Sequence, residues 1–105
     1  METYNYKVHF SKINSFADLH GTLKESLELP YYYGENLDAL YDCLRELARD
    51  KVTIEITGYE NVRAFYHEYS EKLLSVFYDF KHYVEECSPL ITISVEENGK
   101  KIYIE

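Results

Sequence analysis

Lys51-Val-Thr-Ile-Glu-Ile-Thr57 is rich in β-branched residues and is bounded by Asp50 and Gly58, so it predicts a β-strand. The segments on both sides of it have a helical period instead. One predicted helix begins at or near Asn36 and runs to about Ala48, and two more cover about 62–69 and 71–87, where Pro89 stops the last. A strand between helices is joined to its neighbours by crossovers, which predict parallel pairing in a covered sheet.

The outer segments predict two further strands and a first helix. Residues 4–10 alternate between apolar and polar side chains, which is the period of a strand, and residues 90–95 form another strand. Ser15 is a good N-cap, with Asp18 in a loose capping-box position, and Pro30 ends the helix. The apolar face of this helix has helical spacing: Phe16, Leu19, Leu23 and Leu27.

Asn98-Gly99 predicts a two-residue hairpin turn and a short fourth strand. In the register that this turn dictates, apolar residues face apolar ones and acids face lysines: Val95 faces Ile102, Ile93 faces Ile104, and Glu97 and Glu96 face Lys100 and Lys101. We therefore expect one α/β domain over residues 1–105, with a three-stranded parallel sheet, four helices and a C-terminal antiparallel hairpin strand.

The chain is acidic, with a net charge of −8 from 19 acidic and 11 basic residues among 105. Such a charge disfavours nucleic acid and anionic membranes as direct partners, because both require a basic surface. It favours a cationic partner that is attracted over a distance. Many acidic proteins are simply soluble in this way, so charge alone leaves both interpretations open.

Few residues indicate a metal, a cofactor or catalysis. The four histidines lie in separate predicted elements, and His20 near the core edge of its helix is best explained as a structural residue. Cys43 and Cys87 are far apart and outside metal-ligand spacing, so we expect free thiols in a reducing cytoplasm. No signal peptide and no membrane-spanning run is predicted.

The helix predicted over about residues 36–48 carries more acidic side chains than its packing in the fold requires. Asp38, Asp42 and Glu46 recur at i, i+4 and i+8, where like charges destabilise a helix by about 0.2–0.5 kcal/mol per pair. We expect Arg45 to relieve part of this repulsion. A different face forms the core side: Leu37, Leu40, Tyr41, Leu44, Leu47 and Ala48.

Context favours a binding function for this acidic face over a merely solvated one. Tyr31-Tyr-Tyr33-Gly34 lies directly before the helix and predicts an aromatic loop. Aromatic anchors beside carboxylates are typical of binding hot spots, where burial of the rings excludes water from the contacts between charged groups.

The segment Leu29-Pro-Tyr-Tyr-Tyr-Gly-Glu-Asn-Leu-Asp-Ala-Leu-Tyr-Asp-Cys-Leu44 resembles the signature segment of the barstar family, intracellular inhibitors of the ribonuclease barnase. Phe16-Ala-Asp-Leu-His20 and Ser75-Val-Phe-Tyr-Asp79 are similar to that family as well, and the order of elements agrees over about residues 4–95.

The resemblance implies a non-catalytic inhibitor without a cofactor, and a monomer that forms a 1:1 complex with a basic extracellular-type ribonuclease. It implies that Asp42 enters the phosphate-binding site, that Asp38 contacts basic residues at the rim, and that Tyr32 packs on a catalytic histidine. The implied partner-binding residues are Tyr32, Tyr33, Gly34, Asn36, Asp38, Tyr41, Asp42 and Asp79.

Departures from the family leave the target nuclease open. Tyr41 stands where the family has tryptophan, Asp79 is one methylene shorter than the usual glutamate, and the hairpin of 98–105 is extra. One alternative is an immunity protein or antitoxin against a different nuclease or toxin. Another is a small enzyme that uses Asp42 or Asp79 as a general acid or base, which would require a concave pocket.

Overall fold

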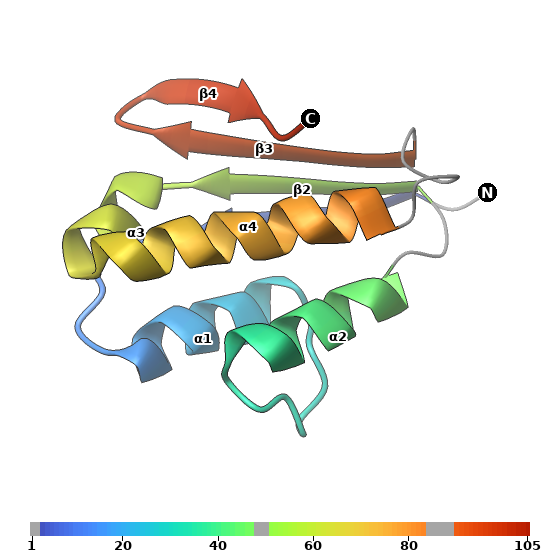
Figure 1. Ribbon diagram of the computed structural model, residues 1–105, viewed down its shortest axis with the longest axis horizontal. Helices are drawn as coiled ribbons and strands as arrows, with labels where there is room; N and C mark the ends of the chain where they lie inside the picture. Colours follow the sequence, from blue (N-terminus) through green and yellow to red (C-terminus); the bar gives the residue numbers. More distant parts are fainter. Residues whose placement is uncertain (1–2, 48–50, 84–89) are drawn as a thin grey trace.

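A computed structural model describes residues 3–47, 51–83 and 90–105 (Figure 1). The predicted alternation of strands and helices is confirmed. The elements in chain order are β1 (Thr3–His9), α1 (Phe16–Ser26), α2 (Leu37–Leu47), β2 (Lys51–Thr57), α3 (Tyr59–Phe65), α4 (His67–Tyr83), β3 (Ile91–Glu97) and β4 (Lys100–Tyr103).

The sheet has the order β1-β2-β3-β4, in which the first three strands are parallel and the last pair is antiparallel, as predicted. The hairpin has the predicted register, because Val95 pairs with Ile102 and the N–H of Ile104 donates to the carbonyl of Ile93 at 2.9 Å. Asn98 and Gly99 adopt φ values of 52° and 80°, as a type I′ turn requires.

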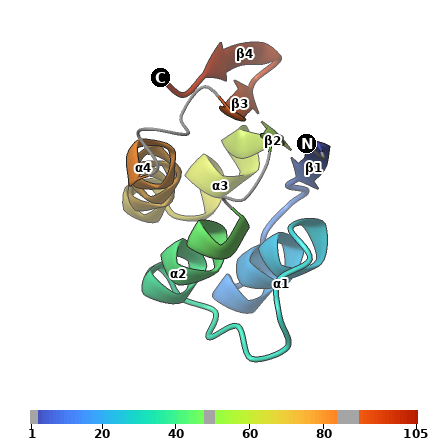
Figure 2. The same cartoon turned by 90° about the vertical axis from the view of Figure 1, so that its right-hand side faces the viewer.

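All four helices lie on one side of the sheet (Figure 2). Both crossovers step in the same direction across the strand order, so right-handed connections bring their helices to the same face. The prediction that helices cover the sheet is therefore correct for one face of the sheet only. The opposite face is open and polar, with Lys7, Thr53 and Thr92 among the residues that point to it.

The core lies between the sheet and the helix layer. Its fully buried side chains alternate along the strands and recur at helical spacing on the helices, as burial on one face requires. They include Val8, Phe10, Leu19, Leu23, Leu27, Leu40, Leu44, Val52, Ile54, Tyr59, Val62, Leu73, Phe77, Phe80 and Ile93.

The boundary between the third and fourth helices was predicted wrongly. The chain turns at Tyr66, which is extended with φ −160° and ψ 101°, so α3 ends and α4 begins about four residues earlier than expected. Tyr66 is neither proline nor glycine, and its extended backbone therefore has no local signal. The predicted helix ends near Ala48 and Cys87, and the stop at Pro89, lie outside the described residues.

The ends of α1 position the loop that follows it. The hydroxyl of Ser15 accepts from the N–H of Asp18 at 3.1 Å, which confirms the predicted N-cap. At the other end, the N–H groups of Glu28 and Leu29 donate back to the carbonyls of Glu25 and Lys24, which is a Schellman motif. This motif ends the helix at Ser26, before Pro30, which was predicted to end it.

Candidate functional site

The loop between α1 and α2 displays two tyrosine rings at the tip of a tight turn. The N–H of Tyr33 donates to the carbonyl of Pro30 at 3.0 Å, so Tyr31 and Tyr32 occupy the two central positions. Their side chains are 90% and 63% exposed, and their rings meet edge to face with centroids 5.6 Å apart. The turn thus presents an exposed aromatic pair on a fixed backbone.

The third tyrosine of the loop faces inward. Tyr33 is 6% exposed, and its hydroxyl lies 2.6 Å from Nδ1 of His20, whose Nε2 lies 2.6 Å from the hydroxyl of Tyr69. Burial lowers the pKa of His20, so the imidazole is held neutral, with one ring nitrogen donating and the other accepting. His20 is structural, as predicted, whereas the ring of Tyr33 anchors the loop from inside and is not available at the surface.

Asn36 joins this loop to α2. Its Oδ1 accepts from the N–H of Ala39 at 2.8 Å, and its Nδ2 donates to the carbonyl of Gly34 at 3.1 Å. The first bond is that of an N-cap, which confirms the predicted start of the helix at Asn36. Gly34 and Asn36 are both exposed, so the segment between the aromatic turn and the helix lies at the surface.

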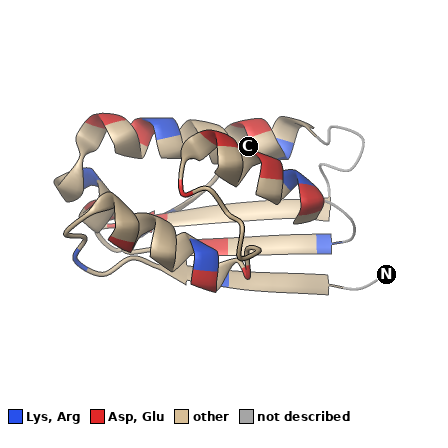
Figure 3. Cartoon of the chain, turned by 90° about the horizontal axis from the view of Figure 1, so that it is seen from below, with Lys and Arg blue, Asp and Glu red and all other residues tan. Residues whose placement is uncertain are grey.

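The acidic residues of α2 form an exposed face that has no ion-pair partner in the part of the chain that the structure describes. Asp38, Asp42 and Glu46 are exposed, and red segments recur along the helices seen in Figure 3. Across residues 3–47, 51–83 and 90–105, ion pairs occur only at Arg63, which binds Glu71 and Glu97. Among the described residues the carboxylates of this face therefore have no ion-pair partner, and they are exposed to solvent.

Arg45 does not pair with these acids, although we expected it to relieve their repulsion. Its guanidinium lies over two rings instead, 5.5 Å from the centroid of Tyr41 and 5.0 Å from that of Tyr83. The two rings are themselves 6.2 Å apart and join α2 to α4. Asp79 is exposed one helical turn before Tyr83, so it lies on the part of α4 that packs beside α2.

The structure thus gathers the predicted residues on the helical side of the molecule. Tyr32, Gly34, Asn36, Asp38 and Asp42 form one continuous stretch of surface along the loop and α2. Half-buried Tyr41 connects that stretch with α4, and Tyr33 supports it from below. Tyr31 was not among the predicted partner-binding residues, although it belongs to the predicted aromatic loop and is the most exposed of its three tyrosines.

Several other types of site find no support in the described part of the chain. It contains no group of three or more His, Cys, Asp and Glu side chains that could hold a metal ion. Asp42 and Asp79 are exposed on helix surfaces. Cys43 is a buried free thiol, and Cys87 lies outside the described residues. Among the same residues, no helix has the length and apolar character that crossing a membrane requires.

Two comparisons relate the chain to known proteins. The model of the family described as "Barstar (barnase inhibitor)" matches residues 4–103. A Bacillus subtilis (strain 168) protein named "Putative ribonuclease inhibitor YrdF" is 40% identical over 58 residues. That match covers 55% of this chain and 64% of the relative, so it spans less than two thirds of the relative's length.

Proposed function

Because the chain belongs to the barstar family, we propose that it is a non-catalytic inhibitor of a barnase-type ribonuclease. The observation that carries this proposal is the exposed pair Asp38 and Asp42, which forms no ion pair with any described residue and lies directly beside the aromatic turn of Tyr31 and Tyr32. The printed name of the Bacillus relative supports the same class of activity.

The mechanism follows from what a ribonuclease must bind. Its active site holds phosphates, and it therefore concentrates arginine, lysine and histidine side chains. The carboxylates of Asp38 and Asp42 lie one helical turn apart on a rigid α2, so they can occupy the cationic field that an RNA backbone would fill. The carboxylates contain no phosphodiester bond, so the ribonuclease cannot cleave them. Its active site therefore stays occupied.

Aromatic burial makes these charge contacts stronger. Tyr31 and Tyr32 expose most of their ring surface in the free protein, and covering them on binding would exclude water from the adjacent ion pairs. The bonds of Tyr33 and Asn36 fix the loop before binding, so little conformational entropy is lost when the partner arrives. Asp79 on α4 supplies a further acidic contact at the edge of this surface.

The charge of the whole chain contributes to the rate of association. A net charge of −8 attracts a basic enzyme over a distance that depends on ionic strength. We propose a 1:1 complex in the cytoplasm, where an active ribonuclease would damage the cell's own RNA.

The test is a titration of the chain into a barnase-type ribonuclease assay beside the Asp42→Asn variant, which keeps the side-chain shape and removes the charge. We expect stoichiometric inhibition by the wild type and a loss of at least ~2 kcal/mol of binding free energy in the variant. Glu68→Gln, an exposed acid in the first turn of α4, loses the same charge and serves as the matched control.

Equal inhibition by Asp42→Asn and by the wild type would show that Asp42 does not enter the phosphate site. Absence of inhibition by the wild type would contradict the barnase-type target. An immunity protein or antitoxin against a different nuclease would then be the next hypothesis, to be tested against nucleases encoded beside its gene.

A further inference from the structure

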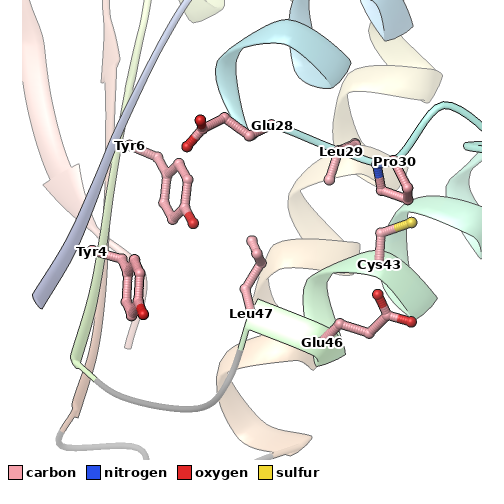
Figure 4. Close-up of a pocket in the computed structure, with 8 residues that line it drawn as sticks. All are labelled: Tyr4, Tyr6, Glu28, Leu29, Pro30, Cys43, Glu46 and Leu47. Atoms are coloured by element: carbon pink, nitrogen blue, oxygen red, sulfur yellow. The ribbon is translucent and has the colours of Figure 1, made fainter. Parts of the chain in front are cut away.

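A second surface feature lies behind the acidic face of α2. It is a cavity of about 270 Å³ between β1, the loop after α1 and the last turns of α2. Figure 4 shows the rings of Tyr4 and Tyr6 along one side of it, with Cys43 and Glu46 along the other and Leu47 between them. The remaining lining residues are Glu28, Leu29 and Pro30.

One wall of this cavity is aromatic. Tyr4 and Tyr6 are two positions apart on β1, so both rings point to the helix side of the sheet. Figure 4 shows the side chain of Glu28 beside the ring of Tyr6. Burial and, after it, the charge of Glu28 raise the pKa of the Tyr6 hydroxyl, in agreement with this closeness. The wall thus offers π surface next to a carboxylate.

The backbone of Glu28 explains how its carboxylate reaches the cavity. Glu28 has a φ of 53°, in the left-handed position of the Schellman motif that glycine usually occupies. The chain leaves α1 at this point, and the side chain projects toward β1 and not along the helix surface. A glycine would satisfy the backbone better, so the fold does not require a glutamate here.

The described residues that line the cavity give it an acidic character. The lining residues include two glutamates and no lysine, arginine or histidine, and neither glutamate forms an ion pair within the described ranges. Burial, followed by the charges of Glu46 and Asp42, raises the pKa of the Cys43 thiol at its edge. Glu46 belongs both to the acidic face of α2 and to the lining of the cavity, so the two acidic surfaces are continuous.

We propose that this cavity is a subsite for an arginine side chain of the ribonuclease partner. The assignment rests on the proposed function and extends it to a second contact. A guanidinium stacks on aromatic rings and binds carboxylates through paired donors, which suits Tyr6 and Glu28 better than a compact ammonium does. The aliphatic stem of the arginine packs on Leu29 and Leu47.

The position of the cavity fits the same partner. Glu46 lies one helical turn beyond Asp42, about 5–6 Å along the helix surface. It thus joins the proposed interface to the mouth of the cavity. An ordinary interface covers about 800 Å² on each partner, enough to include both the aromatic turn and this subsite.

The first experiment uses the chain without any nuclease. N-acetyl-arginine amide is titrated into the labelled protein at constant ionic strength, and the ring resonances of Tyr4 and Tyr6 are followed by NMR. N-acetyl-citrulline amide, a neutral isostere, and N-acetyl-lysine amide with a free side-chain amine are the matched probes. We expect saturable shifts with arginine, weaker binding of lysine and none of citrulline.

Variants then locate the site. Glu28→Gln should weaken binding of the arginine probe by about three- to tenfold, because it removes a charge-assisted contact. Glu46→Gln should weaken it by about two- to threefold, because Glu46 lies on the other side of Leu47 and acts through its charge at the mouth of the cavity. Tyr6→Leu should weaken it by about two- to fivefold through the loss of the ring face. Glu68→Gln removes the same charge outside the cavity and should leave binding unchanged.

The second experiment measures the same variants against the inhibited ribonuclease. A loss of affinity in Glu28→Gln and Glu46→Gln that matches the loss for the probe supports the subsite. Binding of the probe with unchanged nuclease affinity would overturn the partner assignment and indicate a free cation as ligand. Unmoved tyrosine resonances, or equal binding of citrulline, would overturn the guanidinium site itself. Failure of the wild type to inhibit would overturn the proposed function and the partner, while the titration would still decide the chemistry of the cavity.

Discussion

The hydroxyl of Tyr33 lies 2.6 Å from Nδ1 of His20, and this contact joins the loop before α2 to the first helix. The other ring nitrogen of His20 continues the connection to Tyr69 on α4. Three segments that are distant in the sequence thus meet at one buried imidazole directly beneath the exposed aromatic turn.

Tyr33→Phe should lower the free energy of unfolding by about 1–3 kcal/mol, because it leaves a buried ring nitrogen of His20 without a partner. The loop should also loosen, so inhibition should weaken although the lost hydroxyl is not exposed. Urea denaturation measures the first effect and an inhibition assay the second. Tyr32→Phe changes an exposed residue by the same atom and should leave stability within experimental error; a similar loss there would argue against the anchoring role.

The free energy of unfolding should decrease in mildly acidic solution because of His20. Burial lowers its pKa in the folded chain, more than the charge of Glu35 raises it, whereas the unfolded chain has the ordinary value of about 6.5. Below that pH the unfolded state binds a proton that the folded state does not, so the free energy of unfolding decreases until the lowered pKa of the folded state is passed.

The measurement for this titration is urea denaturation at pH 7 and at pH 5.5, in the wild type and in His20→Gln. The variant should be less stable at pH 7 but lose less stability between the two values. Parallel pH profiles would assign the loss to carboxylates elsewhere in the chain.

The acidic face of α2 should reduce stability in the absence of a partner. Asp42→Asn removes two like-charge pairs, with Asp38 and with Glu46, and should raise the free energy of unfolding by about 0.2–0.5 kcal/mol for each pair. Asp18→Asn is the contrasting variant. Its carboxylate accepts from the N–H of Asn14 at 3.0 Å, so its removal should destabilise α1 by about 0.5–1 kcal/mol. A loss of stability in both variants would contradict the binding explanation of the acidic face.

Replacement of two glycines by alanine should change the free energy of unfolding in opposite directions. Gly58 has a φ of 72°, and an added Cβ would lie 2.2 Å from the carbonyl oxygen of Phe10, so Gly58→Ala should cost about 2–4 kcal/mol of stability. Gly21 lies within α1, and apart from the backbone of its own helix and its chain neighbours no atom lies within 4 Å of the same position, so Gly21→Ala should add about 0.5–1 kcal/mol. Thermal unfolding of both variants checks this, and loss of stability in Gly21→Ala would contradict the open environment.

The sequence predicts best where a local pattern determines the structure. Asn98-Gly99 fixes its turn type, and the turn fixes which residues face each other, so the pairing of Val95 with Ile102 could be predicted before any tertiary contact was known. The N-caps Ser15 and Asn36 were predictable for the same reason, because their side chains bond within their own first turn.

It predicts less well where tertiary contacts decide. The chain bends at Tyr66 without proline or glycine, and nothing local distinguishes buried Tyr33 from exposed Tyr31 and Tyr32. Tyr33 turns inward because His20 offers its hydroxyl a buried partner, and that pairing spans 13 residues. The open face of the sheet likewise depends on the direction of both crossovers together.

Because all four helices lie on one side of the sheet, the protein can be attached to a sensor surface in a defined orientation. Lys7 is exposed on β1 and alternates with buried Val8, so it points to the open face of the sheet, whereas exposed Asp42 belongs to α2 in the helix layer on the other side of the sheet (Figure 2). A linker attached through the open face would hold the chain on a sensor surface with α2 directed into the solution. An immobilised form of the protein would thus be attached through one face, and the proposed inhibitory surface would remain free on the other.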